Sequence, residues 1–441
     1  MKNGYDCIVA GAGPAGLMAA ITAAREGAKV LLLERKSEPC KKLYATGNGR
    51  CNFTNLNMDE GVYRGGGAGL AREAVDTFDR NDLLGFFHDL GLMTKHIGDY
   101  VYPYNEQASS VAGVLLSEIR RLGVELHCDE MVVDIIPSCD EMKVDINYIV
   151  KTDKEEYRAT NVIITVGGKA SPTHGSDGSL NKVIRRLGHR IIPQQPALVP
   201  LLFSDKTLSE LAGVRVKCGA FLQREEDALP EENVLSEEEV LSEDGKQDLL
   251  SEEGEIIFNK DNISGIPVMQ LSRFAVMEIE EGRSCCLLLD FFPRESREEL
   301  QDWLKRSATT WADPLRTVSD VLSFCLPEKL ADHILKKCGL SPEDKAAGLS
   351  EKTIGRITEL CKGFPVPVCD NAGFNRAQVT AGGVDCDQVS DRMESLLHPG
   401  LFFAGEVLDV DGTCGGYNLH WAFASGRIAG REAAARCGKR D

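Results

Sequence analysis

The stretch that most constrains this chain lies almost at its N-terminus, where a short apolar run meets three glycines. Residues 7–10 are apolar and predict a buried strand, and Gly11, Gly13 and Gly16 follow with the spacing G-x-G-x-x-G. Gly11 permits a tight turn out of the strand, Gly13 lets the backbone approach a pyrophosphate, and Gly16 lets a helix pack closely on the strand. The sequence therefore predicts a strand–turn–helix unit that can hold phosphate groups.

The residues after this turn complete the pattern of a dinucleotide-binding unit. A helix rich in Ala and Met is predicted over residues 17–26, and a second buried strand over residues 28–33 ends at Glu34. The helix N-terminus presents free N–H groups and a partial positive charge to phosphates, and Glu34 is placed to accept hydrogen bonds from a ribose diol. A lone Gly-rich turn is weak evidence, but here all parts follow in order within about 30 residues. The pattern favours an ADP-containing dinucleotide over a turn without a ligand.

The net charge of −18 is concentrated in one segment. Residues 225–255 hold 14 acidic residues and one lysine, which leaves a net charge of −5 for the rest of the chain. Nucleic-acid binding is disfavoured, because proteins that bind nucleic acids need a positive surface. The acidic segment is interpreted as an elongated hairpin or solvated excursion, with a docking element for a basic partner as the alternative.

Length and composition bound the class of protein. A chain of 441 residues is expected to form two or three domains. It contains no stretch of about 18 apolar residues and no signal-peptide pattern, so we expect a cytoplasmic protein without a membrane span. The 15 cysteines include no C-x-x-C pair and no zinc-ligand spacing, which predicts free thiols and no metal site.

Glycine-rich turns return near the C-terminus, far from the first turn. A buried strand ends at Gly405–Glu406, and Gly415–Gly416 open a long helix predicted up to residue 435. A flavin fold explains both ends of the chain: the N-terminal turn takes the ADP half, and the C-terminal helix start faces the flavin ring. There its N–H groups and dipole stabilise the anionic reduced flavin. A helix docked on the sheet with a glycine cap is the alternative.

Two motifs are much more specific than G-x-G-x-x-G. They are Thr46-Gly-Asn-Gly-Arg-Cys-Asn-Phe-Thr-Asn55 and Gly415-Gly-Tyr-Asn-Leu419, accompanied by Lys41-Lys42, Thr380-Ala-Gly-Gly-Val384, Phe403-Ala-Gly-Glu406, Asp409 and Gly412. With them the sequence closely resembles, nearly end to end, the BaiN/RdsA-type family of FAD-dependent oxidoreductases, also labelled aminoacetone-oxidase-like. The resemblance implies an α/β fold with a discontinuous Rossmann-like FAD-binding domain, an inserted β-barrel-like domain and a nested helical segment.

Proline-rich stretches near Ile191 and Pro367 agree with these boundaries. The expected parts are an FAD-binding domain over 1–192 and 367–441, a barrel-like domain over 193–263 and 340–366, a helical segment over 264–339, and the acidic excursion over 225–255. The acidic excursion is where this chain departs most from the family.

Two local expectations concern the FAD-binding domain. Residues 71–90 are predicted to form one helix, because apolar residues recur along them at helical spacing. Residues 44–55 contain two glycines, an arginine and three asparagines, which predicts a polar loop along the cofactor.

The resemblance also implies which residues surround the FAD. Those assigned to the ADP half are Gly11, Gly13, Ala15, Gly16, Glu34 and Arg35, with Val133 contacting the adenine through its backbone. Those assigned to the pyrophosphate and flavin are Lys42, Gly47, Arg50, Cys51 and Asn52. Those assigned to the ribityl chain and ring are Gly405, Glu406, Gly415, Gly416, Tyr417 and Asn418. Gly167, at the end of another predicted strand, is expected next to the cofactor.

Few side chains are candidates for acid–base or redox chemistry. Tyr417 and His420 flank the start of the ring-binding helix, and Cys51 lies in the flavin loop, with a structural role as the alternative for His420 and for Cys51. Cys414 is the thiol that motif placement suggests as a partner for Cys51. No second G-x-G-x-x-G is present in the middle of the chain, so NAD(P)H is expected to dock transiently at the flavin.

Three functions stay open from the sequence. The first is NAD(P)H-driven reduction of an activated C=C bond through FAD. A bile-acid or steroid-like enone is the preferred substrate class, because the resemblance includes bile-acid-inducible members of the family that are described as reducing unsaturated 3-oxo bile acids. The second is an oxidase or dehydrogenase of a small amine. The third is a flavin-bearing electron carrier or scaffold. We favour the first, with a small-molecule substrate and no expectation for the oligomeric state.

Overall fold

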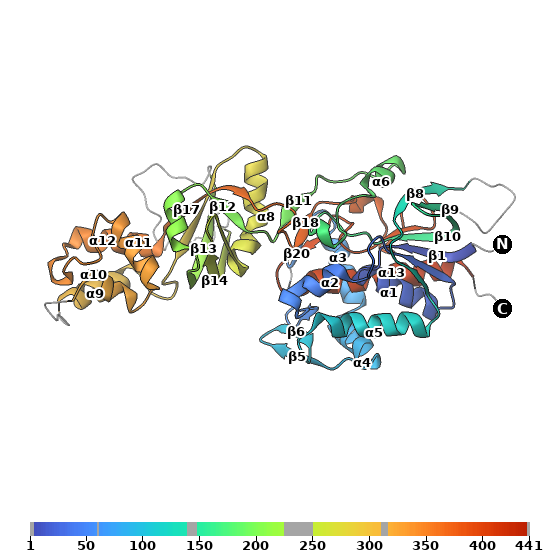
Figure 1. Cartoon of the computed structure of the whole chain (residues 1–441), viewed down its shortest axis with the longest axis horizontal. Helices are drawn as coiled ribbons and strands as arrows, with labels where there is room; N and C mark the ends of the chain where they lie inside the picture. The colour runs from blue at the N-terminus through green and yellow to red at the C-terminus, as the bar shows by residue number, and fades with distance from the viewer. Residues whose placement is uncertain (1–3, 60, 139–147, 225–249, 310–315, 439–441) are drawn as a thin grey trace. The chain divides into compact units, whose positions relative to one another are not determined.

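The computed structural model describes residues 4–59, 61–138, 148–224, 250–309 and 316–438. The chain divides into unit 1, residues 1–196 and 374–441, and unit 2, residues 197–373. Figure 1 shows the helices and strands of both units. Within the described residues, no helix combines the length and the hydropathy needed to cross a bilayer.

The core of unit 1 is a seven-stranded sheet in which the first strand is central. Its strands are β1 (Gly4–Ala10), β2 (Val30–Leu33), β7 (Glu125–His127), β8 (Val132–Pro137), β9 (Tyr148–Thr152), β10 (Glu156–Ile164) and β19 (Leu401–Phe403). The order is β7-β2-β1-β10-β9-β8, with β19 also paired to β10. Strands β7, β2, β1, β10 and β19 are parallel to one another, whereas β9 runs antiparallel to both of its neighbours, β10 and β8. Near-continuous burial of β1 and β2 fits strands covered on both faces.

The helices α1 (Pro14–Arg25) and α13 (Tyr417–Arg436) lie side by side against this sheet, and α5 (Ala108–Arg121) packs on α1 (Figure 1). A Cβ atom on Gly430 would lie 2.3 Å from the carbonyl oxygen of Ala19. The two helices therefore approach closely only because small residues line their contact. Consequently the first and last helices of the chain form one packed pair.

Shorter elements complete unit 1. The helices are α2 (Lys41–Ala45), α3 (Ala68–Thr77), α4 (Arg80–Asp89) and α6 (Asn181–Arg186), with 3₁₀ turns η1 (Thr46–Gly49), η2 (Pro172–His174) and η6 (Cys386–Gln388). The small sheets are β3 (Thr54–Asn55) with β6 (Tyr100–Pro103) and β5 (Thr94–Ile97), β20 (Asp411–Gly412) with β4 (Tyr63–Arg64), and β11 (Gln195–Ala197) with β18 (Val379–Ala381).

Two local predictions for unit 1 differ from the structure. The single helix expected over residues 71–90 is two helices, α3 and α4, because Asp79 caps the second by accepting the N–H groups of Asn81 and Asp82. The polar loop expected over residues 44–55 contains the end of α2, the turn η1 and the strand β3. A capping Asp stabilises the start of a helix, and Asp79 thereby divides the continuous apolar pattern of residues 71–90 into two helices.

Unit 2 is built on a closed six-stranded antiparallel barrel. Its strands are β12 (Leu201–Phe203), β13 (Arg215–Arg224), β14 (Ser251–Phe258), β15 (Asn262–Gly265), β16 (Cys285–Asp290) and β17 (Phe364–Asn371), in the order β12-β15-β14-β13-β16-β17. The helix α8 (Ile266–Glu280) packs on β14 and β13, and the 3₁₀ turn η3 (Lys206–Leu211) follows β12. The predicted α/β Rossmann-like fold with an inserted barrel is confirmed.

The helical segment of unit 2 differs from its expected limits, 264–339. It lies between β16 and β17 and consists of α9 (Arg297–Thr309), α10 (Val318–Ser323), α11 (Glu328–Lys337), η5 (Ala346–Gly348) and α12 (Glu351–Lys362). The strand β16 falls inside the expected helical range but pairs with β13 and β17 of the barrel. Of the acidic excursion, residues 225–249 lie outside the described residues, and residues 251–255 belong to β14.

Candidate functional site

The first glycine turn has the geometry that a dinucleotide pyrophosphate requires. A Cβ atom on Gly16 would lie 1.9 Å from the carbonyl oxygen of Gly11, so only glycine lets α1 start this close to β1. A Cβ atom on Gly13 would meet no described atom within 4 Å, which leaves open space at the N-terminus of α1. The Thr165 hydroxyl stabilises the turn, because it donates a hydrogen bond to the carbonyl oxygen of Gly11 at 2.8 Å. The sequence reasoning missed Thr165.

Glu34 is fixed at the end of β2 beside this turn. One carboxylate oxygen accepts the N–H of Ala12 at 2.9 Å and the other accepts the N–H of Lys36 at 2.8 Å. A carboxylate oxygen can accept more than one hydrogen bond, so both oxygens keep capacity for ribose hydroxyls. The structure thus places Glu34 beside the first glycine turn, and its contact with a ribose stays a prediction.

The segment that is expected to contact the adenine lies next to Glu34, at the start of β8. The N–H of Glu130 donates to the carbonyl oxygen of Glu34 at 2.9 Å. In the following strand, Val132 pairs with Thr152 and Asp134 with Lys151, so Val133 is a bulge residue without a partner in β9. A bulge leaves the backbone of the extra residue unpaired, which suits the backbone contact expected of Val133.

The loop over residues 46–52 is held in an unusual backbone conformation. Gly47 and Asn48 are left-handed, with φ of 57° and 55°, and Cys51 has φ of 57°. Left-handed conformations are costly for residues other than glycine and gather at ligand sites. The Oδ1 atom of Asn52 is buried and has no hydrogen-bond partner among the described residues. A bound group with a hydrogen-bond donor would satisfy this oxygen.

The N-terminus of α13 faces the same loop. A Cβ atom on Gly416 would lie 2.7 Å from the backbone nitrogen of Thr54 and 2.9 Å from Asn52 Oδ1, and Gly416 has φ of 94°. No described side chain caps this helix start. The Asn418 side chain instead forms two hydrogen bonds with the backbone of Gly412. Its Oδ1 accepts the N–H of Gly412 at 2.8 Å, and its Nδ2 donates to the carbonyl oxygen of Gly412 at 2.7 Å. The uncapped N–H groups of α13 therefore supply the donors and the partial positive charge of this site.

Lys42 and Glu406 form an ion pair between α2 and the end of β19. The other oxygen of Glu406 accepts the N–H of Thr380 at 3.0 Å. The Thr380 hydroxyl accepts the N–H groups of Lys169 and Ala170. Gly405 lies against the first helix, since a Cβ atom there would be 2.9 Å from the Ala15 Cβ. The structure thus brings Lys42 to Glu406 and Gly405 to Ala15, and it links Glu406 to Thr380.

Arg35, Arg50 and Gly167 have contacts that the sequence did not reveal. Arg35 pairs with Asp177, with 2.5 Å between Nη1 and Oδ2. Arg50 lies 5.2 Å over the Tyr102 ring and donates to Glu106 at 3.0 Å, with 48% of its side chain exposed. Gly167 lies against Ser176, whose Oγ would be 2.5 Å from a Cβ atom on Gly167. The Gly-Ser-Asp-Gly-Ser run at residues 175–179 is the signal that could have indicated this loop.

The three candidate catalytic side chains are committed to structural contacts. His420 is fully buried, with Nδ1 2.8 Å from the Thr54 hydroxyl and Nε2 3.0 Å from the Phe78 carbonyl oxygen, and burial lowers its pKa to about 4. The Tyr417 hydroxyl donates to the Asn57 carbonyl oxygen at 2.9 Å, and burial raises its pKa to about 12. Burial likewise raises the pKa of the Cys51 thiol to about 12. Within the described residues, the Tyr417 hydroxyl thus donates to the protein and both His420 nitrogens face protein oxygens, and a catalytic role of the three side chains stays a prediction.

The cysteines give no support to a redox pair. Within the described residues, no disulfide joins Cys51 to Cys414. In the same part of the chain, no group of three or more His, Cys, Asp and Glu residues is arranged to hold a metal ion.

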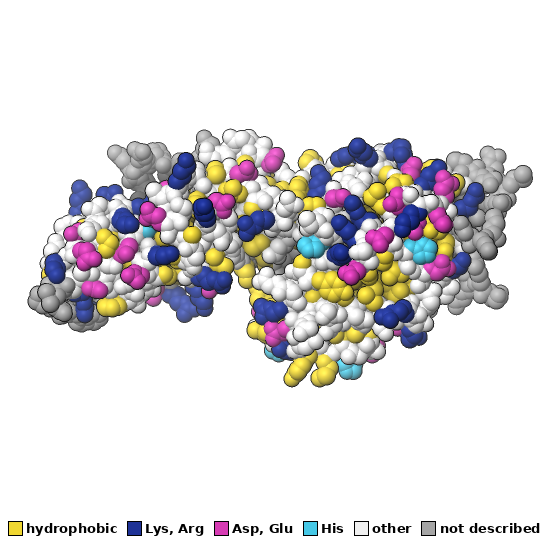
Figure 2. All heavy atoms as spheres, viewed as in Figure 1, with side chains coloured by type: hydrophobic (Ala, Val, Ile, Leu, Met, Phe, Trp, Pro, Cys, Tyr) yellow, Lys and Arg dark blue, Asp and Glu magenta, His cyan; other side chains and the backbone are white. Residues whose placement is uncertain are grey.

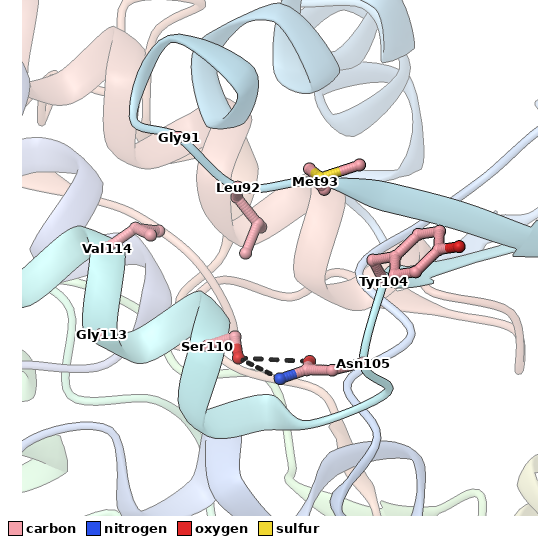
Figure 3. Close-up of a pocket in the computed structure, with 8 residues that line it drawn as sticks. All are labelled: Gly91, Leu92, Met93, Tyr104, Asn105, Ser110, Gly113 and Val114. Atoms are coloured by element: carbon pink, nitrogen blue, oxygen red, sulfur yellow. Dashed lines mark hydrogen bonds between the residues drawn. The ribbon is translucent and has the colours of Figure 1, made fainter.

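One pocket of about 430 Å³ lies on unit 1 beside β5 and α5 (Figure 3). Its lining residues are Gly91, Leu92, Met93, Tyr104, Asn105, Ser110, Gly113 and Val114. Asn105 and Ser110 hydrogen bond to each other at 2.9 Å. None of the predicted site residues lines this pocket.

The residues present fit an FAD molecule. The open N-terminus of α1, the ribose acceptor Glu34, the partnerless Asn52 Oδ1 and the uncapped start of α13 are four separate features that a dinucleotide carrying a flavin would engage.

Known proteins are similar to this chain over nearly its whole length. The model of the HI0933-like protein Rossmann domain matches residues 5–432. The chain is 36% identical over 435 residues to a 3-dehydro-bile acid delta(4,6)-reductase of Clostridium scindens, covering 97% of this chain and 98% of the relative. It is 26% identical over 429 residues to a ribosomal RNA dihydrouridine synthase of Escherichia coli, covering 96% of each protein.

Among solved structures, the fold is similar to that of a flavocytochrome c3 fumarate reductase in its open conformation. The TM-score is 0.50 at 16% identity, covering 99% of this chain and 79% of the other. This likeness concerns the fold alone. The family match spans nearly the whole sequence, and so the chain belongs to the HI0933-like family of FAD-dependent Rossmann-fold oxidoreductases, in agreement with the resemblance of its motifs to BaiN/RdsA-type proteins.

Proposed function

We propose that this protein reduces an activated C=C bond, with NAD(P)H as the reductant and an enone of the bile-acid or steroid type as the substrate. The observation that carries the proposal is that the N-terminus of α13 lies next to Asn52 Oδ1 and that, among the described residues, neither the helix start nor this oxygen has a side-chain partner. Such a place favours a flavin that gathers negative charge on reduction. The name of the 36% identical relative, a delta(4,6)-reductase, supports the choice of reaction.

Residues of this chain would hold and tune the cofactor. FAD, when bound, supplies the hydride chemistry. The first turn of α13 directs N–H groups and a partial positive charge toward the ring-binding side, which favours the reduced anion over the oxidised form. Asn52 accepts a hydrogen bond through the oxygen that otherwise has no partner. Glu34 and the Gly13 opening hold the ADP half at the other end.

Arg50 is the side chain that we assign to the substrate. It lies two residues before Asn52, its guanidinium is half exposed, and Glu106 and the Tyr102 ring fix its position. A guanidinium has five N–H donors, of which this contact with Glu106 uses one. The remaining donors can bind the carbonyl oxygen of an enone and draw electron density from its β-carbon. Since Tyr417, His420 and Cys51 are committed elsewhere, the proton for the α-carbon is assigned to solvent.

An anaerobic experiment tests this function. The purified yellow protein is mixed with NADH or NADPH while the flavin absorbance is followed, and 3-oxo-Δ4 and 3-oxo-Δ4,6 steroids are then added. We expect one nicotinamide to bleach the flavin and the enone to restore its colour with formation of the saturated ketone. If neither nicotinamide bleaches the flavin, the reductase proposal fails. Oxygen consumption with aminoacetone, without nicotinamide, would instead support the amine oxidase.

A second candidate is reduction of a uracil C5=C6 bond in RNA. The ribosomal RNA dihydrouridine synthase of Escherichia coli favours this candidate, because its name also describes reduction of a C=C bond. Its match with this chain covers 96% of each protein. On the face shown in Figure 2, Lys and Arg side chains are interspersed with Asp and Glu, and the sequence-based expectation of no nucleic-acid partner stays a prediction. The reduced protein is offered ribosomal RNA and the enone in parallel, and mass spectrometry of nucleosides detects dihydrouridine.

A further inference from the structure

A loop of unit 1 crosses the glycine turn that the ADP half is expected to occupy. The parallel strands β2, β1 and β10 are neighbours in that order, so their carboxyl ends share one edge of the sheet, with the turn after β1 in the middle. Residues 167–180 follow β10, on one side of this turn. Arg35 and Lys36 follow β2, on the other side. A contact between these two segments therefore bridges the two sides of the turn that follows β1.

The structure contains such contacts. Arg35 Nη1 lies 2.5 Å from Asp177 Oδ2 and 3.3 Å from the Ser179 hydroxyl oxygen. A Cβ atom on Gly175 would lie 3.5 Å from the Lys36 side chain. Two adjacent residues after β2 thus contact one short stretch of the loop.

The base of the loop is closed by its own backbone. The N–H of Gly178 donates to the carbonyl oxygen of Gly168 at 3.1 Å, and Ser176 lies against Gly167. These contacts hold the loop to the end of β10 whether or not it reaches β2. The connection across the turn therefore depends on Arg35 and Lys36.

The geometry points to a loop, residues 167–180, that covers the ADP half of the bound dinucleotide, and to an ion pair, Arg35–Asp177, that slows release of the dinucleotide. We call the loop the strap and the ion pair the latch. Arg35 is then a positioning residue that acts through Asp177 rather than a direct ligand of the nucleotide. This inference rests on the FAD site of the proposed function, but it concerns cofactor release and not the reaction.

Asp177 can carry the negative charge that an ion pair with Arg35 requires. Burial acts against ionisation, yet hydrogen bonds from Arg35 and Ser179 hold the pKa of Asp177 below its usual value. Asp177 Oδ1 accepts the N–H of Ser179 at 3.0 Å, and an asparagine can keep this bond. Asp177→Asn therefore removes the charge while it preserves the turn.

The test measures FAD release from the holoprotein by the rise of free-flavin fluorescence after dilution. The proteins compared are wild type, Arg35→Gln, Asp177→Asn, the double variant, and Glu156→Gln as the control for an exposed ion pair on β10, whose partner is Lys151 at 2.7 Å. A partly exposed pair contributes up to about 1 kcal/mol, so each single variant is expected to release FAD about three- to fivefold faster. The double variant should release FAD no faster than either single variant.

Salt separates a latch from a general loss of stability. Between low salt and about 1 M NaCl, release from wild type should accelerate and approach the rate of Asp177→Asn, whose own rate should change little. Equal release rates for wild type and Asp177→Asn, or a double variant in which the two effects add, would overturn the latch. Faster release in the variants without any nicotinamide-driven turnover would leave the latch standing and overturn the proposed reaction.

Discussion

The carbonyl oxygen of Ala15 and the Cα of Gly426 meet so closely that a Cβ atom on Gly426 would lie 2.3 Å from that oxygen. Ala15 lies within the first glycine motif, in the first turn of α1, and Gly426 lies in the middle of α13. The backbones of α1 and α13 are therefore in direct contact. This contact fixes the distance between the first turn of α1 and the middle of α13.

We predict that Gly426→Ala destabilises the protein, because the new methyl group must displace α13 from α1. The expected loss is about 1–3 kcal/mol of the free energy of unfolding, measured by chemical denaturation. Gly85→Ala in α4 is the control, since a Cβ atom there meets no described atom within 4 Å. The control should be neutral or stabilising by up to about 1 kcal/mol. Equal stabilities of the two variants would contradict the close packing.

Asn52→Ala should weaken flavin binding. The variant removes the buried oxygen that lacks a partner among the described residues and that the cofactor is proposed to satisfy. Loss of one such hydrogen bond corresponds to about a tenfold rise in the Kd for FAD, measured by titration of the apoprotein. Asn105→Ala, at the pocket of Figure 3, should leave this Kd unchanged. An Asn52 variant with wild-type affinity would remove this residue from the site.

Arg50→Ala should slow enone reduction but not reduction of the flavin by NAD(P)H. The guanidinium is proposed to bind the substrate carbonyl, and loss of a donor at a developing oxyanion costs about 100-fold in rate or more. Stopped-flow absorbance separates the two half-reactions. Arg72→Ala is the control, because Arg72 forms an exposed pair with Asp76 on α3. Equal slowing of both half-reactions would assign Arg50 to the flavin instead.

Stability should fall in mild acid because of His420. Burial lowers its pKa to about 4, below the usual value of 6.5, so the folded state binds fewer protons than the unfolded state between these values. This contribution is therefore complete above pH 6.5 and is lost as the pH falls toward 4, by about 3 kcal/mol in total.

The measurement for His420 is the unfolding free energy against pH. His420→Gln should be less stable at pH 7 and should show a shallower decline between pH 6.5 and 4 than wild type. The control is His96→Gln, at an exposed side chain whose Nδ1 lies near the Gly98 carbonyl oxygen. Parallel curves for wild type and His420→Gln would contradict a neutral buried imidazole.

Cys51 should be unreactive in the folded protein, because burial raises its pKa to about 12 and excludes reagents. Brief treatment with iodoacetamide at pH 8, followed by peptide mass spectrometry, should modify the exposed Cys325 and Cys369 but not Cys51. Cys51→Ala should retain the flavin and the activity. A redox role would instead appear as loss of turnover with the flavin still bound.

The sequence predicts the parts of this site that are local along the chain. Gly11, Gly13, Gly16 and Glu34 lie within one strand–helix–strand unit, so their spacing alone indicates their roles. Lys42, Gly405 and Gly416 were assigned through family motifs, and the structure brings them to the same region. The contacts of Thr165, Thr380 and Asp177 were not predicted, because each joins segments far apart in sequence and leaves no periodic pattern.

The errors have the same origin. The strand β16 was recognised as a strand but was placed in the helical segment, because its own residues do not reveal that β13 and β17 are its partners. The break between α3 and α4 depends on Asp79, whose side chain competes with the apolar pattern that continues on both sides. The hydrogen bonds of Tyr417 and His420 to the carbonyl oxygens of Asn57 and Phe78 were likewise not predicted, because these partners lie far away in sequence.

The pairing of α1 with α13 also bears on how the protein is made. The two helices are separated by roughly 390 residues, so a ribosome completes nearly the whole polypeptide before α1 can meet the helix that packs against it. Contacts of such long sequence separation form slowly. A nascent chain that has emerged only as far as the barrel holds the first glycine turn without the ring-binding half. If α13 holds the flavin ring as proposed, the complete site forms only after residue 417 has left the ribosome, and a chain truncated before that residue lacks α13.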